Sequence, residues 1–116
     1  MVSRNQQIGN YDPLPLGYLR KIHPPEEYEE IFILPNCRLS VGRDVENEIS
    51  IPNERSSSRF HCVFISDNEN VYINERSGHG TFVNGERIYQ TREITDDDKI
   101  QIGQTVFHFV KSDESK

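Results

Sequence analysis

Residues 60–74 read FHCVFISDNENVYIN, and this stretch decides the fold class. Within 60–66, apolar side chains occupy both alternating sets of positions, which predicts a strand buried on both faces at the centre of a sheet. Polar residues at 67–70 end the apolar run and are typical of a turn. Alternation then resumes at 71–74, so the stretch predicts a central strand, a turn and a second strand.

Short strands and turns continue in both directions from this centre. The Asn84-Gly85 pair between apolar runs is the strongest short signal for a β-hairpin, and Gly103-Gln104 joins the last two strands in a similar way. No long stretch has helical periodicity. The predicted strands span 17–22, 28–34, 38–42, 49–51, 60–66, 71–74, 81–83, 87–89, 99–102 and 106–110.

These strands predict an all-β fold, a two-sheet β-sandwich of about ten short, mainly antiparallel strands with binding loops at one end. An immunoglobulin-type sandwich is disfavoured because its Cys…Trp…Cys signature lacks the Trp here. The 116 residues fit one domain. We expect a flexible N-terminal lead-in at 1–16, the domain at 17–111 and a C-terminal tail at 112–116.

Composition restricts the class of partner and the compartment. The net charge of −6 disfavours general attraction to nucleic acid or to anionic membranes. Cys37 and Cys62 are too few for a disulfide framework, and Cys62 is predicted to be a reduced, half-buried small hydrophobic residue. The sequence has no secretory signal and no apolar run long enough to span a bilayer, so we expect an intracellular protein.

Three loops have unusual chemistry. They cover residues 42–44, 53–59 and 77–80, and together they contain arginines, hydroxyl groups and glycines that expose backbone amides. Such groups bind a dianionic phosphate through charge-assisted hydrogen bonds. Loops are also rich in these residue types for ordinary turn reasons, so composition alone only suggests a phosphate site.

Order and spacing add to this suggestion. The motifs GR at 42–43, SRFH at 58–61, SGHGTFVNG at 77–85 and DKIQIG at 98–103 together resemble the signature of the forkhead-associated (FHA) domain family. The resemblance covers about 17–111. In addition, PLGYL at 15–19 resembles the start of this domain in checkpoint-type Ser/Thr kinases.

The resemblance implies a non-catalytic module that binds phosphothreonine in partner proteins and mediates phosphorylation-dependent interactions. It further implies the regulatory domain of a checkpoint or meiotic Ser/Thr kinase, a nuclear location in DNA damage signalling, and phosphorylation-dependent self-association. No nucleic acid, membrane, cofactor or metal is expected as a partner.

The family motifs assign phosphopeptide contacts to five positions. Arg43 matches the arginine that contacts the phosphate, where a planar guanidinium gives a bidentate pair that Lys cannot copy. Ser58 matches the serine whose hydroxyl and backbone hold the phosphate, and Arg59 would add a second cationic contact. Gly78 leaves open space, and His79 stands where the family usually has an Asn that binds the ligand backbone. An imidazole there would alter the geometry and add pH dependence.

Other positions would select the ligand or support the loops. Arg55 and Ser57 lie in the loop that helps the family choose residues beyond the phosphothreonine, although a solvated Arg55 and a loop-supporting Ser57 are the more ordinary interpretations. The residues expected to support the site are Gly42, His61, Gly80, Thr81 and Asn84.

Two other classes of function remain as alternatives. An enzyme could use Ser58 with His61, but no nucleophile elbow and no orienting acid accompany them. No histidines or cysteines have metal-ligand spacing. The remaining alternative is a structural or dimerising β-module whose binding does not depend on phosphate.

Overall fold

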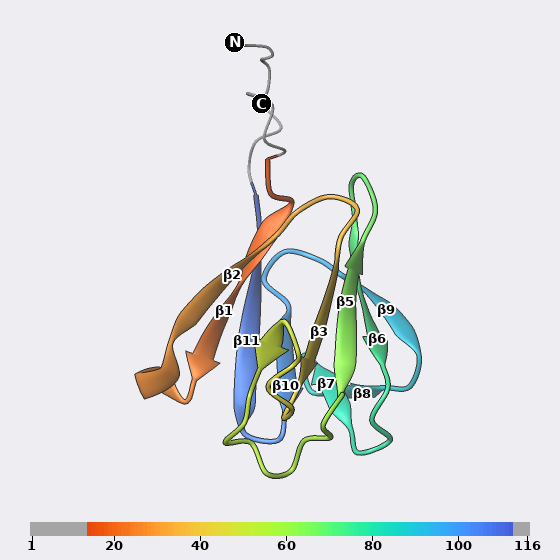
Figure 1. Ribbon diagram of the computed structural model, residues 1–116. Coiled ribbons are helices and arrows are strands. Elements are labelled where there is room, and N and C mark those ends of the chain that lie inside the picture. The colour runs from red at the N-terminus through yellow and green to blue at the C-terminus, as the bar shows by residue number, and fades with distance from the viewer. Residues whose placement is uncertain (1–13, 113–116) are drawn as a thin grey trace.

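Alternation along the strands places their apolar side chains on one face, and two sheets bury these faces against each other. The computed structural model describes residues 14–112 as a β-sandwich (Figure 1). The six-stranded sheet has the order β2 (Glu29–Ile33), β1 (Gly17–His23), β11 (Thr105–Lys111), β10 (Lys99–Ile102), β7 (Thr81–Val83) and β8 (Glu86–Ile88). The five-stranded sheet has the order β4 (Ile49–Ser50), β3 (Arg38–Gly42), β5 (Cys62–Ser66), β6 (Val71–Glu75) and β9 (Thr91–Ile94).

The core lies between the two sheets. Phe107 and Phe109 of β11 and Phe64 of β5 are its largest fully buried side chains. Each such side chain stabilises the fold by about 1.5–3 kcal/mol relative to leaving it exposed. The all-β sandwich predicted from the sequence is therefore confirmed, with eleven strands among residues 14–112 where about ten were predicted.

The central strand β5 lies in the middle of its sheet, as predicted, but it begins at Cys62. Phe60 is 51% exposed, because the chain before β5 is hydrogen-bonded to the β3–β4 loop, where Asp44 N–H donates to the Arg59 carbonyl at 3.1 Å. The half-buried state predicted for Cys62 is wrong. Its side chain points into the core and is 1% exposed, and burial raises the pKa of this free thiol far above its ordinary value.

The hairpin predicted at Asn84-Gly85 is confirmed. Asn84 has φ of 52° and Gly85 has φ of 86°, and both positive values are required by a type I′ turn between β7 and β8.

Strand β9 was not predicted, because its residues Thr91–Ile94 bury only Ile94 and therefore lack an apolar alternation. The pairing of β3 with β4 is parallel, whereas all the other described strand pairs are antiparallel.

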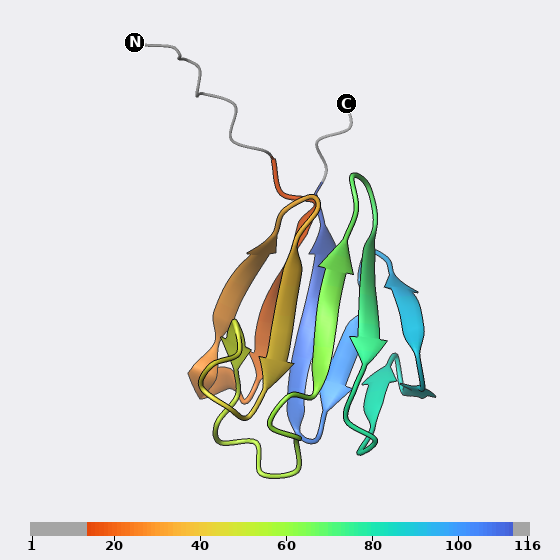
Figure 2. The same ribbon diagram turned by 45° about the vertical axis from the view of Figure 1, so that its right-hand side comes forward.

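The two ends of the sandwich differ. The chain enters and leaves at one end, and the β3–β4, β4–β5 and β6–β7 loops lie at the other (Figures 1 and 2). Leu16, which the sequence placed in the lead-in, is buried and donates from its N–H to the Ile33 carbonyl at 2.7 Å. Residues 1–13 and 113–116 lie outside the described residues, and the domain bounds stay a prediction.

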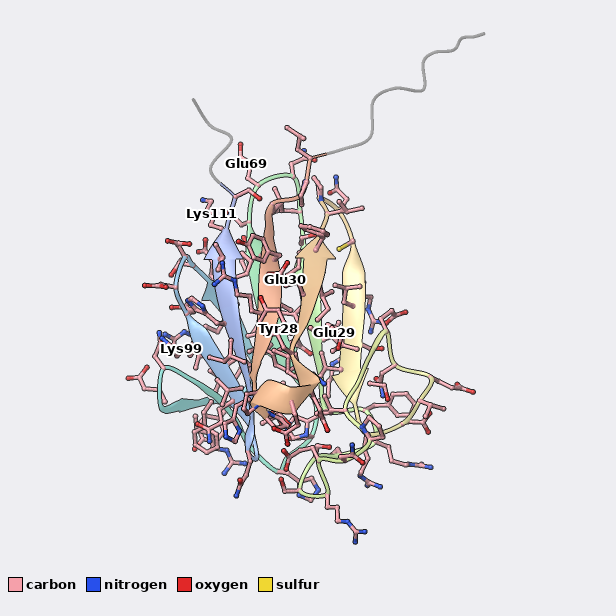
Figure 3. The ribbon with its side chains drawn as sticks, turned by 90° about the vertical axis from the view of Figure 1, so that its left-hand side faces the viewer. Tyr28, Glu29, Glu30, Glu69, Lys99 and Lys111 are labelled. Carbon is pink, nitrogen blue, oxygen red and sulfur yellow. The ribbon has the colours of Figure 1, made fainter. Side chains whose placement is uncertain are left out.

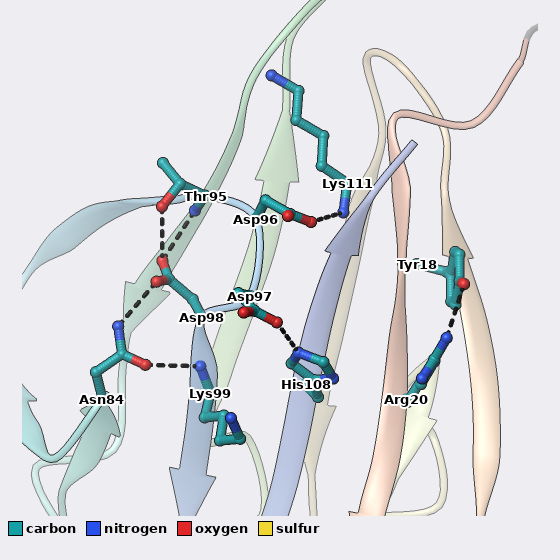
Figure 4. Close-up of polar contacts among 10 residues, drawn as sticks. All are labelled: Tyr18, Arg20, Asn84, Thr95, Asp96, Asp97, Asp98, Lys99, His108 and Lys111. Atoms are coloured by element: carbon teal, nitrogen blue, oxygen red, sulfur yellow. Dashed lines mark hydrogen bonds and ion pairs between the residues drawn. The ribbon is translucent and has the colours of Figure 1, made fainter. Parts of the chain in front are cut away.

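The outer face of the six-stranded sheet carries cations that have acidic neighbours. On this face Arg20 Nε lies 4.0 Å from Glu30 Oε2. Lys21 lies on the inner face instead, opposite Phe107; it is 5% exposed, and its ammonium group lies 3.6 Å from Glu27 and 3.8 Å from Glu29. Figure 3 shows Glu29 and Glu30 on β2, together with Tyr28 just before it. His108 on the same sheet contacts Asp97 at 2.6 Å (Figure 4).

Among residues 14–112, no helix is long and apolar enough to cross a membrane.

Candidate functional site

The first two loops identified in the sequence lie side by side. Arg43 N–H donates to the Ser58 carbonyl at 3.0 Å, and Arg43 Nε donates to the Ser57 carbonyl at 3.1 Å. The structure thus brings Arg43 and Ser58 to the same rim of the sandwich. Arg43 is exposed and Ser58 is half-buried. Only Nε of this guanidinium makes a hydrogen bond within residues 14–112, so its terminal nitrogens are available for a ligand.

Gly42 and Asn47 hold these two loops together. A Cβ atom on Gly42 would lie 2.1 Å from the Arg59 carbonyl oxygen and 2.9 Å from Asn47 Nδ2, so only glycine fits there. Asn47 Nδ2 donates to the Asp44 carbonyl at 2.8 Å and to the Arg59 carbonyl at 2.7 Å. The sequence did not single out Asn47, since an Asn in a turn is ordinary and nothing local shows that it is buried.

His61 connects the second loop to the third. Its Nδ1 accepts from Ser58 N–H at 3.0 Å, so Nε2 carries the proton and donates to the Gly80 carbonyl at 3.0 Å. The imidazole is 1% exposed, and this burial lowers its pKa because it disfavours the charged form. His61 therefore supports the loops as a neutral side chain.

The third loop uses its own backbone amides. Gly78 N–H donates to Glu75 Oε2 at 2.6 Å, while His79 and Gly80 N–H donate to Ser77 Oγ at 2.8 Å and 3.3 Å. The expectation of exposed amides for phosphate was therefore wrong for these three groups. The reason is that the side chains of Glu75 and Ser77 already accept hydrogen bonds from these three amides.

Glu75 organises this loop and was missed by the sequence analysis. Burial by itself would raise the pKa of its carboxyl, but hydrogen bonds from Ser77, Thr81 and Gly78 outweigh burial and hold the pKa below its ordinary value. Thr81 is fully buried and its hydroxyl donates to Glu75 Oε1. No local pattern shows that the last residue of β6 turns its carboxylate toward the following loop.

The remaining predicted site residues separate into exposed and buried groups. Arg55, Arg59, Gly78 and His79 are exposed, and a Cβ atom on Gly78 would meet no atom within 4 Å. Ser57, predicted as a candidate for specificity, is 4% exposed and its hydroxyl donates to the Glu54 carbonyl at 2.7 Å. That assignment is corrected, because the Ser57 hydroxyl is committed to the structure of its own loop.

Asn84 lies at a different place from the binding loops. Its Nδ2 donates to Asp98 Oδ1 at 2.8 Å, and its Oδ1 accepts from Lys99 N–H at 2.9 Å (Figure 4). These contacts tie the β7–β8 turn to the segment before β10, at the opposite end of β7 from Gly80. The sequence correctly expected Asn84 to join turns, but the turns are not those of the candidate site.

The distribution of charge distinguishes this end of the molecule. Among the arginines in residues 14–112, Arg20 and Arg92 lie within 4.0 Å of a carboxylate. The others lack such a partner in the described part of the chain: Arg43, Arg55, Arg59 and Arg76 lie on the three loops or next to them, Arg87 lies on β8, and Arg38 lies at the start of β3, away from the loops. Figure 3 shows side chains tipped with nitrogen projecting from the loops at its lower edge. Uncompensated cations on a chain of net charge −6 create a local field that attracts anions.

No group of three or more His, Cys, Asp or Glu side chains within residues 14–112 could hold a metal ion.

Arg87 supports the third loop. Its Nη2 donates to the Gly78 carbonyl at 3.1 Å, and its guanidinium group stacks 5.1 Å from the centre of the Tyr89 ring. Arg87 was also missed, because its partner lies nine residues earlier in the sequence and no motif connects the two.

Comparison with known proteins agrees with this architecture. Nibrin of Danio rerio is 36% identical over 69 residues, which make up 59% of this chain and 8% of that protein. The structure of Mycobacterium tuberculosis EmbR in complex with a low-affinity phosphopeptide is 27% identical with a TM-score of 0.74, and the match covers 88% of this chain and 26% of that one. The FHA domain of an Arabidopsis thaliana hypothetical protein is 26% identical with a TM-score of 0.76, and the match covers 88% of this chain and 90% of that one.

The chain thus spans only a small part of Nibrin and of EmbR. A family model described as FHA domain matches residues 39–103, which contain all three loops and are more than half of the 116 residues. This chain belongs to the FHA domain family.

Proposed function

We propose that this domain binds phosphothreonine-containing segments of partner proteins and performs no catalysis itself. The observation that carries the proposal is the convergence of Arg43, Ser58 and Arg59 at one rim, where no guanidinium of the described residues is paired with a carboxylate. A phosphothreonine brings a charge of about −2 and three acceptor oxygens, which match this set of donors.

Each residue of the rim has a distinct part in the proposed complex. The Arg43 guanidinium is oriented by its bond to the Ser57 carbonyl, and its two terminal nitrogens would donate to two phosphate oxygens. The Ser58 hydroxyl makes no hydrogen bond within residues 14–112, so it would donate to the third oxygen, and Arg59 would add charge. His79 and Gly78 would meet the ligand backbone, and Arg55 would contact a residue farther along the ligand.

The setting of this interaction is proposed from resemblance. The match of residues 15–19 to checkpoint-type kinases supports a Ser/Thr kinase parent, a nuclear location and a role in DNA damage signalling. Such a parent could also use this domain for phosphorylation-dependent self-association. Nucleic acid and membrane are not proposed as partners, since the overall charge repels both.

The proposal is tested by titrating the domain with a degenerate phosphothreonine peptide library and with the same library carrying unmodified threonine. We expect binding only to the phosphorylated library. Equal binding to both libraries would contradict the proposal and favour a β-module that binds independently of phosphate. Circular dichroism of the domain before and after titration checks that it stays folded.

A further inference from the structure

The outer face of the five-stranded sheet contains a recess of about 280 Å³ beside the candidate site. Its lining combines arginine side chains with apolar surface, from Arg38, Ser40, Phe60, Cys62, Val63 and Arg76. Val63 lies opposite Ser40 on β3 and opposite Asn74 on β6, so it forms the floor in the centre of the sheet. It is only 5% exposed, although it faces outward.

Arg76 is held over this floor. Its Nε donates to Asn74 Oδ1 at 2.5 Å, and its backbone N–H donates to the His61 carbonyl at 3.0 Å. Arg38 approaches from β3. Neither guanidinium lies within 4.0 Å of a carboxylate in the described part of the chain. The recess therefore has two cations, and Phe60, which is 51% exposed, provides an apolar wall.

Glu48 borders the recess on the side of β3. Glu48 Oε1 accepts from the Ser40 backbone N–H at 2.8 Å and from Ser40 Oγ at 2.7 Å, which fixes this carboxylate beside β3. It offsets part of the charge of Arg38, whereas Arg76 lies on the other side of Val63. The balance of charge in the recess stays positive, and its chemistry favours an anion.

The recess is lined partly by residues that directly adjoin the proposed phosphate site along the chain. Phe60 directly follows Arg59, and Arg76 directly precedes the loop that carries Gly78 and His79. Arg38 and Arg43 are five residues apart along an extended strand, a separation of about 17 Å. An extended ligand covers the same distance in about five residues.

We propose that the recess binds an acidic side chain, a carboxylate or a second phosphate, located four to six residues from the phosphothreonine of the same ligand. The acidic group enters between Arg38 and Arg76, and the neighbouring part of the ligand packs against Phe60. This inference rests on the proposed function, and it adds a second anion to the ligand at a defined distance.

The experiment compares phosphothreonine peptides with Glu or Gln at each position from four to six residues before and after the phosphothreonine. We expect Glu to tighten binding about three- to tenfold at one or more of these positions. Arg38→Ala and Arg76→Ala should each remove this gain while leaving the affinity for the Gln peptide unchanged. Arg92→Ala is the matched control, because Arg92 is paired with Glu86 on another edge and should keep the gain.

A phosphoserine arm identifies the source of the anion. A larger gain from phosphoserine than from Glu assigns the recess to a second phosphate, and an equal or smaller gain assigns it to a carboxylate. The inference is overturned if no acidic position gives a gain, or if the gain persists in Arg38→Ala and Arg76→Ala. If phosphothreonine peptides bind no better than threonine peptides, the proposed function itself is wrong, and the two failures are thereby distinguished.

Discussion

Strand β7 has a polar network around a carboxylate at each end, Glu75 at the Gly80 end and Asp98 at the Asn84 end. Only the Gly80 end also carries an exposed arginine without a carboxylate partner among residues 14–112. At the Asn84 end, Asp98 is 8% exposed and accepts from Asn84 Nδ2 and from Thr95 N–H at 2.8 Å each, so its charge is used within the fold (Figure 4). At the Gly80 end, His61 satisfies the loop backbone, but the exposed Arg43 beside it has no carboxylate partner among residues 14–112.

The difference separates stability from binding. A polar group that is fully satisfied inside the protein contributes to the free energy of unfolding and has little left for a ligand. An exposed, unpaired cation contributes little to stability and keeps its hydrogen-bonding capacity for an anion. Substitutions at the two ends of β7 should therefore have opposite profiles.

The largest expected effect is on ligand affinity at the Gly80 end. Arg43→Ala should weaken phosphothreonine peptide binding by one to two decades, since a charged hydrogen-bond partner contributes about 1.5–3 kcal/mol. The free energy of unfolding should change little, by about 1 kcal/mol or less, because the exposed side chain gives up only the hydrogen bond from its Nε to the Ser57 carbonyl. Isothermal titration and urea unfolding measure the two quantities. Unchanged affinity in this variant would show that the site is assigned wrongly.

At the Asn84 end we expect the reverse. Asn84→Gly keeps the positive φ of 52° available but removes the hydrogen bonds to Asp98 and Lys99. The free energy of unfolding should fall by about 1–2 kcal/mol, because Asp98 is buried and loses a donor. Peptide affinity should be unchanged. If Asn84→Gly lowers peptide affinity without lowering the free energy of unfolding, the assignment of stability to this end of β7 is wrong.

The pH dependence of stability tests the Gly80 end without a ligand. Burial lowers the pKa of His61 below its ordinary value of 6.5, so its contribution to stability is complete above pH 6.5 and is lost as the pH falls below that value. Unfolding at pH 7 and at pH 5.5 should show a decrease that is smaller in His61→Gln, which cannot titrate. If both proteins lose stability equally between these pH values, His61 is not the responsible group.

The smallest expected effect concerns His79. Its exposed imidazole should contact the ligand backbone, and His79→Asn should change peptide affinity by severalfold. Peptide titrations on both proteins under the same conditions measure this. If the variant binds the peptide as tightly as the original protein, His79 makes no ligand contact.

Much of the fold could be predicted because the signals are local. The alternation in β3, β7 and β10 gave strand bounds that match the structure at both ends. Strand β9 was missed because a polar edge strand has no such pattern. The early start predicted for the central strand was wrong, because the Arg59 carbonyl accepts from Asp44 in the β3–β4 loop and β5 begins only at Cys62. At the site, the order of the motifs indicated which loops matter. The supporting roles of Asn47, Glu75 and Arg87 could not be predicted, since they depend on tertiary contacts.

The sequence by itself determined the sandwich and the type I′ turn at Asn84-Gly85, because side-chain alternation and the preference for positive φ act within a few neighbouring residues. Only the tertiary structure decided which backbone amides of the third loop are already used, that Ser57 is buried, and that Arg38 and Arg76 flank one recess. These outcomes depend on residues that are distant in the chain and adjacent in space. Local preferences carry no information about such neighbours.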